Sequence, residues 1–177
     1  MKEQSTTKSF AILSAAGMIV KILSLLYIPF LKGIITDEGY GVYGAAYSVY
    51  VFIYVITNSG IPVAISKLIS ELTAVKNYRD AVKSFKISRF ILLIIGTFMT
   101  ILMLLFARPL SKAVHYDKAY LSILALSPAI LFTSIASAYR GYFQGWGNMV
   151  PTAVSQVIEQ IVNTIFTLVF AALLMRY

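Results

Sequence analysis

The stretch FILLIIGTFMTILMLLF, residues 90–106, contains no charged side chain. A helix needs about 20 predominantly apolar residues, within a range of about 17–25, to cross the hydrocarbon layer of a bilayer. Within lipid, a helix also satisfies its backbone N–H and C=O groups inside its own segment. The stretch is therefore predicted to be a transmembrane α-helix of an integral membrane protein.

Comparable apolar stretches lie on both sides of this one. The predicted transmembrane helices cover about residues 10–35, 43–72, 90–106, 119–142 and 151–175, with a basic cytoplasmic loop at about 73–89. The first helix continues well past the short apolar core of a cleaved signal peptide, so we expect it to stay in the protein. We expect an all-α integral membrane protein in which about five transmembrane helices form a single unit over residues 1–177.

The composition excludes several classes of protein. Charged residues make up 12% of the chain and hydrophobic residues 59%, and the mean hydropathy is +0.80. A soluble domain usually carries about 25% charged residues. The chain has no cysteine and a single histidine, so we expect neither a thiol nucleophile nor a metal site. No enzyme or nucleotide-binding motif is present, so no enzymatic activity and no cofactor are expected, and a coupling ion stays open.

Lysine and arginine are unevenly divided between the two sides of the predicted bundle. The side of the N-terminus holds nine: Lys2, Lys8, Lys67, Lys76, Arg79, Lys83, Lys86, Arg89 and Arg140. The other side holds five: Lys32, Arg108, Lys112, Lys118 and Arg176. Because basic residues collect on the cytoplasmic side, we predict a plasma-membrane protein with a cytoplasmic N-terminus. The same rule accounts for the net charge of +8 without a nucleic-acid partner.

Lys21 is the most unusual residue of the first predicted helix. It sits about twelve residues into the helix, roughly 18 Å along its axis, which is near the middle of the bilayer. Ser14, Gly17 and Ser24 recur at helical spacing on the same face. An ionisable group at this depth usually faces protein or water. It could meet an anionic substrate, or it could snorkel to the interface or take part in a structural ion pair.

A polar stripe marks the last predicted helix. Its members fall within an arc of roughly 100° on a helix with 3.6 residues per turn, and they include Gln156, Glu159, Gln160 and Asn163. Such a stripe either holds helices together or lines a hydrated cavity. Glu159 could also pair with Lys21.

Two features single out the helix predicted at 43–72. Tyr43, Tyr47, Tyr50 and Tyr54 share one side. They extend about 16 Å along the helix axis, which is deeper than an interfacial aromatic belt. This row is either ordinary aromatic packing or a surface for a sugar-bearing or amphipathic substrate. Gly60 and Pro62 interrupt the same helix, and proline removes a backbone hydrogen bond, so they are candidates for a kink or hinge.

Several segments resemble one family of exporters. They are the first-helix residues Lys8-Ser9-Phe10, Ala15-Ala16-Gly17 and Lys21, then DEGYGVYGAAYS (37–48), NSGIPVAISKLISE (58–71) and YRGYFQGWGNMVPTAVSQVIEQ (139–160). The chain resembles the stage V sporulation protein B and MurJ-type lipid II flippase family. This family of polysaccharide biosynthesis and export proteins belongs to the multidrug/oligosaccharidyl-lipid/polysaccharide exporter superfamily. The resemblance covers nearly the whole chain.

This resemblance implies a MATE-like transporter of two helical lobes around a cavity that opens alternately to each side of the membrane. The cargo would be a lipid-linked oligosaccharide, typically an undecaprenyl-linked peptidoglycan or polysaccharide precursor. Lys21 falls where the family has a basic residue at the cavity wall that meets the pyrophosphate. Members have more than twice as many helices, so this chain corresponds to an incomplete N-terminal lobe. The second lobe would come from further sequence or from another chain.

Two alternatives stay open beside the flippase. A cation-coupled multidrug exporter of the same superfamily would export hydrophobic cations, for which a cavity that bears a lysine is poorly suited. A non-transporting interaction protein of the cell envelope would need no second lobe, and it would copurify with a partner.

Overall fold

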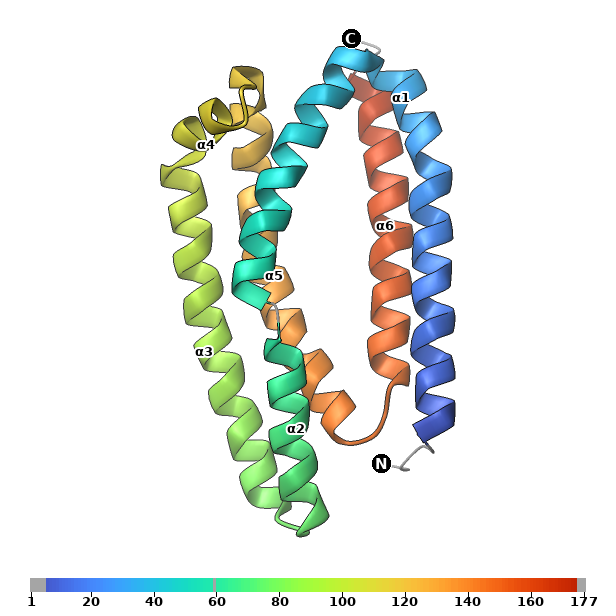
Figure 1. Cartoon of the computed structure of the whole chain (residues 1–177), viewed down its shortest axis with the longest axis vertical. Coiled ribbons are helices and arrows are strands. Elements are labelled where there is room, and N and C mark those ends of the chain that lie inside the picture. Colours follow the sequence, from blue (N-terminus) through green and yellow to red (C-terminus); the bar gives the residue numbers. More distant parts are fainter. Residues whose placement is uncertain (1–5, 59, 175–177) are drawn as a thin grey trace. The chain divides into compact units, whose positions relative to one another are not determined.

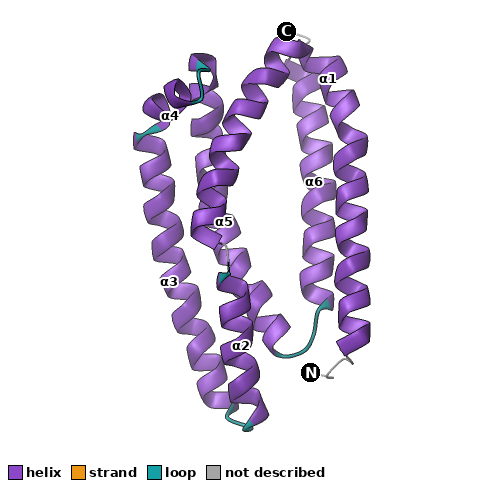
Figure 2. Cartoon of the chain, viewed as in Figure 1, coloured by secondary structure: helices purple, strands orange, loops and turns teal. Residues whose placement is uncertain are grey.

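The structure is a computed structural model that describes residues 6–58 and 60–174. The described residues form helices and contain no β-strand (Figure 1), and Figure 2 shows how short the connecting loops are. In chain order the elements are α1 (Thr6–Asn58), α2 (Ile61–Ala74), α3 (Tyr78–Leu105), α4 (Ala107–Ala113), the 3₁₀-helix η1 (Asp117–Ala119), α5 (Tyr120–Gly145) and α6 (Val150–Leu174). Lys2, Arg176 and the expected end of the last helix at residue 175 lie outside the described residues.

Within the described part of the chain, four helical segments are long and apolar enough to cross a membrane: Thr7–Ala74, Tyr78–Leu105, Asp117–Gly145 and Val150–Leu173. The first has 68 residues. As one straight helix it would be about 100 Å long, against a hydrocarbon layer of about 30 Å. It contains both of the N-terminal helices that the sequence predicts. The protein is an all-α integral membrane protein, as the sequence predicts.

The predicted turn after residue 35 is a kink inside α1. Ile35 (φ −100°, ψ 16°) and Thr36 (φ 57°, ψ 165°) leave the helical conformation, and the helix then resumes. The Thr36 hydroxyl accepts a hydrogen bond from the Gly39 N–H at 3.4 Å, as an N-cap residue does. Asp37 and Glu38 follow in the first turn, where the helix dipole favours acidic side chains. The polar residues that suggest a turn therefore start the next helical segment.

The helix predicted at 43–72 is broken in two. α1 ends at Asn58 and α2 begins at Ile61. Gly60 caps α2 in the left-handed conformation, with φ 78° and ψ −18°, which glycine adopts without a Cβ clash. Pro62 lies in the first turn of α2, where an N–H has no intrahelical partner to lose. The predicted interruption at Gly60 and Pro62 is a complete break between two helices.

The segment expected to be a basic loop at 73–89 is helical from Tyr78 onward. Asn77 caps α3: its side-chain oxygen accepts a hydrogen bond from the Asp80 N–H at 3.3 Å, and its amide donates to the Asp80 carboxylate at 2.8 Å. A capping residue of this kind satisfies an N–H group that has no intrahelical partner. The third predicted helix is therefore the C-terminal part of a longer α3. α5 and α6 begin within one residue of their predicted starts.

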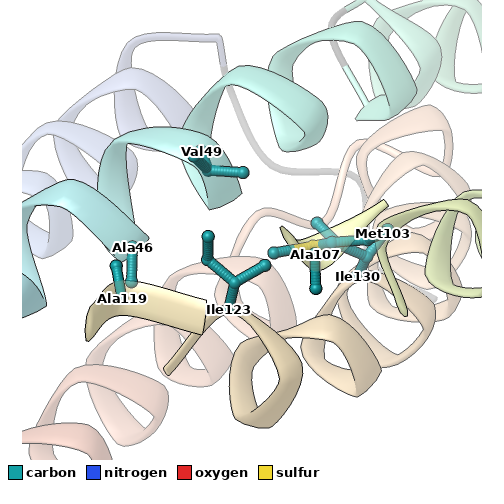
Figure 3. Close-up of a cluster of buried hydrophobic side chains, with 7 residues drawn as sticks. All are labelled: Ala46, Val49, Met103, Ala107, Ala119, Ile123 and Ile130. Carbon is teal, nitrogen blue, oxygen red and sulfur yellow. The ribbon is translucent and has the colours of Figure 1, made fainter. Parts of the chain in front are cut away.

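The contacts between residues group the chain into two compact units, and α1 contributes to both. The first unit contains Met1–Gly41 and Gly147–Tyr177, and the second contains Val42–Trp146. The second unit has a buried apolar cluster to which α1, α3, α4, η1 and α5 contribute (Figure 3): Ala46, Val49, Met103, Ala107, Ala119, Ile123 and Ile130. A further buried cluster joins α2, α3 and α5, and the partly buried Trp146 packs against it. The Trp146 ring stacks on Tyr78 with ring centroids 5.6 Å apart.

Small residues allow close helix packing in the second unit. The buried face of α5 includes Ser127, Ser134, Ser137, Ala138, Gly141 and Gly145. A Cβ added at Gly141 would lie 2.7 Å from the Pro62 carbonyl oxygen, and one at Gly145 would lie 2.5 Å from the Ile69 Cβ. Helices in lipid associate through close packing of small residues, because no hydrophobic effect drives them together. The glycine pair at 141 and 145 therefore serves the contact between α2 and α5.

Replacement of Gly145 by alanine tests this packing. We expect Gly145→Ala to destabilise the protein by about 1–3 kcal/mol, the usual cost of overpacking. The measurement is the temperature at which the detergent-solubilised protein loses its monodisperse gel-filtration peak. Gly44→Ala is the matched control, because nothing lies within 4 Å of a Cβ at Gly44, and it should leave that temperature unchanged or raise it. Equal losses in both variants would contradict the packing role.

Candidate functional site

Lys21 lies in the first unit, on the helical part of α1 before the kink. It is exposed, and it makes no ion pair or hydrogen bond with the described part of the chain. Nothing lies within 4 Å of a Cβ built at Gly17, one turn before it. The Ser24 hydroxyl donates to the Val20 carbonyl at 2.8 Å, within the helix. Lys21 is thus a cation on an open, small-residue face of an apolar helix.

The polar stripe of α6 belongs to the same unit. Glu159 and Asn163 are exposed, and Gln156 and Gln160 are half-buried. Two hydrogen bonds run along the helix: the Gln160 amide donates to the Thr164 hydroxyl at 3.4 Å, and the Thr167 hydroxyl donates to the Asn163 oxygen at 3.2 Å. These bonds satisfy part of the stripe within the helix itself. Lys21 and Glu159 do not form an ion pair.

The tyrosine row is a continuous stack in the second unit. Successive ring centroids are 5.9, 6.0 and 6.1 Å apart from Tyr43 to Tyr54, with interplanar angles of 13°, 30° and 25°. Tyr50 and Tyr54 pack against the buried cluster of Figure 3, whereas the Tyr47 side chain is 47% exposed. Offset aromatic stacking at this spacing is favourable. The row is therefore anchored to the core on one side and presents ring surface on the other.

The break between α1 and α2 contains an unpaired polar group. Asn58 is buried, with 4% of its surface exposed, and neither polar atom of its side-chain amide has a hydrogen-bond partner among the described residues. Gly60 and Pro62 follow two and four residues later. A buried amide without a partner costs about 1–3 kcal/mol in proteins. The break between the two helices thus lies beside a buried amide that has no partner among the described residues.

The contact between Arg89 and Tyr139 was not predicted from the sequence, where Arg89 counts only as one of the positive charges on the cytoplasmic side. The Arg89 guanidinium donates a hydrogen bond to the Tyr139 hydroxyl at 3.0 Å. Asn77 was the sequence signal that could have indicated this contact, because a helix that begins there contains Arg89. Among the described residues, no cluster of three or more His, Cys, Asp or Glu side chains could hold a metal ion.

Comparison with known proteins gives one matching family and several relatives. Residues 6–177 match the family described as polysaccharide biosynthesis protein. The chain is 34% identical to stage V sporulation protein B of Bacillus subtilis, over 100% of this chain and 34% of that protein. It is 29% identical to the lipid II flippase MurJ of the same organism, over 93% of this chain and 32% of that protein.

A further relative is the uncharacterized membrane protein YabM of Bacillus subtilis, which is 33% identical over 84% of this chain and 27% of that protein. The chain spans about a third of the length of these curated relatives. No solved structure matches it.

Truncation of two neighbouring rings separates the stacking of the tyrosine row from its core packing. Tyr47 and Tyr50 each stack on two other tyrosines, but of these two only Tyr50 packs against the buried cluster. We expect Tyr50→Ala to destabilise the protein by about 1–3 kcal/mol more than Tyr47→Ala, because it leaves a cavity in the core. Thermal unfolding of both variants in detergent gives the comparison. Equal effects would show that the row contributes through stacking alone.

Proposed function

This chain belongs to the polysaccharide biosynthesis protein family, and we propose that it forms the N-terminal part of a transporter for a lipid-linked oligosaccharide in the plasma membrane. The family match over residues 6–177 carries the proposal. The name of one relative, lipid II flippase, supports an undecaprenyl-linked peptidoglycan or polysaccharide precursor as cargo. Such transport makes and breaks no covalent bond, so it requires a passage for the polar head group and no catalytic group.

Lys21 supplies the charge that this cargo needs. The pyrophosphate of a lipid-linked sugar is anionic, and the transfer of an unpaired anion into a low-dielectric region is very costly. A lysine ammonium that is exposed on an apolar helix and has no partner among the described residues can offset that cost. Open space beside Gly17 leaves room for a head group. Lys21 would therefore neutralise the phosphate during passage.

The tyrosine row, the polar stripe of α6 and the break before α2 each have a separate role in this proposal. The open ring surface at Tyr47 suits contact with sugar or polyprenyl groups, since aromatic faces bind both apolar chains and the C–H faces of sugars. The stripe with Glu159 on α6 supplies a hydrated patch that eases repacking or couples an ion. The break at Gly60 and Pro62 serves as a hinge, because it is one of the two places where the described helices of the span Thr7–Ala74 are interrupted.

Alternating access needs more helices than these described ones. The chain spans about a third of its relatives, so we propose that further sequence or another chain supplies the second lobe. The cavity would then open alternately to the two leaflets. The excess of basic residues on the side of the N-terminus supports a cytoplasmic N-terminus.

Substitution of Lys21 tests the transport role. In vesicles that contain the native protein with this chain, Lys21→Gln should slow movement of a fluorescent lipid-linked sugar about tenfold or more, because one charge-assisted contact with phosphate is lost. Lys21→Arg should keep most of the rate. Lys32→Gln is the matched control, because Lys32 lies over the Tyr40 ring, 4.6 Å from its centroid, and has no assigned role. Unchanged transport in Lys21→Gln would overturn the assignment.

The predicted orientation has its own test, because the chain contains no cysteine. Single cysteines replace Lys76, before α3, and Lys112, at the end of α4. A membrane-impermeant maleimide should label Lys112→Cys in intact cells and Lys76→Cys only after the membrane is opened. The reverse pattern would place the N-terminus outside the cytoplasm.

A further inference from the structure

A surface pocket of about 280 Å³ lies between α3 and α5, and neither Lys21 nor the tyrosine row lines it. α3 lines it with Arg89, Phe90 and Leu93, and α5 lines it with Ile135 and Tyr139. All five residues belong to the second unit. Phe90, Leu93 and Ile135 contribute apolar surface. Arg89 contributes a charged group, and Tyr139 contributes both a ring and a hydroxyl. The pocket therefore has the chemistry of a site for a molecule with one polar end and one apolar end.

Arg89 is held in place at the polar end. Its guanidinium donates to the Tyr139 hydroxyl at 3.0 Å and lies 6.0 Å from the centre of the Phe85 ring. A guanidinium has five N–H donors in a fixed fork. The Tyr139 hydroxyl is the acceptor recorded for it within the described part of the chain, so further donors remain available to a ligand. This fork matches the geometry of a phosphate group, as it does that of a carboxylate.

The surface of α3 changes character at the pocket. Arg79, Lys83 and Lys86 are exposed on the first turns of α3. They fall in an arc of roughly 80° with Phe90 and Leu93, at 3.6 residues per turn. The same helix face is therefore basic up to Lys86 and apolar from Phe90 onward. This change marks the boundary between head groups and hydrocarbon, and it places Arg89 at the depth of lipid phosphates.

We propose that this pocket binds an anionic phospholipid of the surrounding bilayer. The lipid phosphate bonds to Arg89 and Tyr139, the basic face of α3 attracts the net negative charge, and the start of one acyl chain packs on Phe90, Leu93 and Ile135. Basic pockets between transmembrane helices bind anionic head groups by this combination. A free phosphate would leave the apolar part unfilled, and a zwitterionic lipid would gain little from the basic face.

The test measures lipid retention by the native protein that contains this chain, purified in detergent. Phosphatidylglycerol and phosphatidylcholine with identical acyl chains are titrated, and bound lipid is counted by native mass spectrometry. Phosphatidylglycerol should bind more tightly. Arg89→Gln should weaken its binding about tenfold, as loss of one charge-assisted hydrogen bond does. Ile135→Trp, which fills the apolar part without a change of charge, should weaken both lipids.

Arg108→Gln is the matched control, because Arg108 carries the same charge and lies 5.2 Å from the centre of the Tyr120 ring but does not line the pocket. It should leave binding unchanged. Helical circular dichroism and gel filtration verify folding, and Tyr139→Phe replaces Arg89→Gln if the latter misfolds. Equal binding of both lipids, or an equal loss in Arg108→Gln, would overturn the proposal. So would a dependence on Arg89 that appears only with undecaprenyl phosphate, because the pocket would then hold the carrier lipid.

Discussion

Backbone hydrogen bonding inside lipid governs this architecture. Hydrocarbon offers no partner for an N–H or C=O group, so each interruption of a helix must satisfy its own free ends. The kink in α1 does so with the Thr36 hydroxyl, which accepts from Gly39. The break before α2 has no side-chain cap at Gly60, but Pro62 in the first turn removes one of the N–H groups that would need a partner. Among the described residues, the Asn58 side-chain amide beside this break has no hydrogen-bond partner, so the two interruptions differ in what they leave unsatisfied.

Two kinds of packing hold the second unit together. Along α5, small residues let α2 and α3 approach closely. A single added carbon at Gly141 or Gly145 of α5, or at Gly96 of α3, would clash. Along α1, large aromatic rings stack on one another and press on the buried cluster. Contacts between helices in lipid depend on shape. Close backbones and broad rings are two different solutions to that requirement, and this unit uses each on a different helix.

The sequence predicts the helical class and the positions of α5 and α6 well, because long apolar stretches have one stable form in lipid. It predicts the start of α3 poorly. Basic residues before position 90 suggest a loop, whereas the Asn77 cap starts the helix earlier. The composition indicates where the chain leaves the hydrocarbon, whereas the capping residue indicates where the helix begins. In α3 these two positions lie about three helical turns apart. Contacts such as that between Arg89 and Tyr139 depend on how helices face one another, which spacing within one helix does not reveal.

Trp146 is the single tryptophan of the chain, and its position gives the protein an intrinsic optical reporter. Its ring stacks on Tyr78 at the start of α3 and meets Tyr142 of α5 edge-on, 6.2 Å away. Indole emission responds to solvent and to neighbouring rings, so its wavelength and polarisation report on the seam between α3 and α5. Fluorescence of the unmodified protein can therefore follow rearrangement of this seam in real time, without an attached dye.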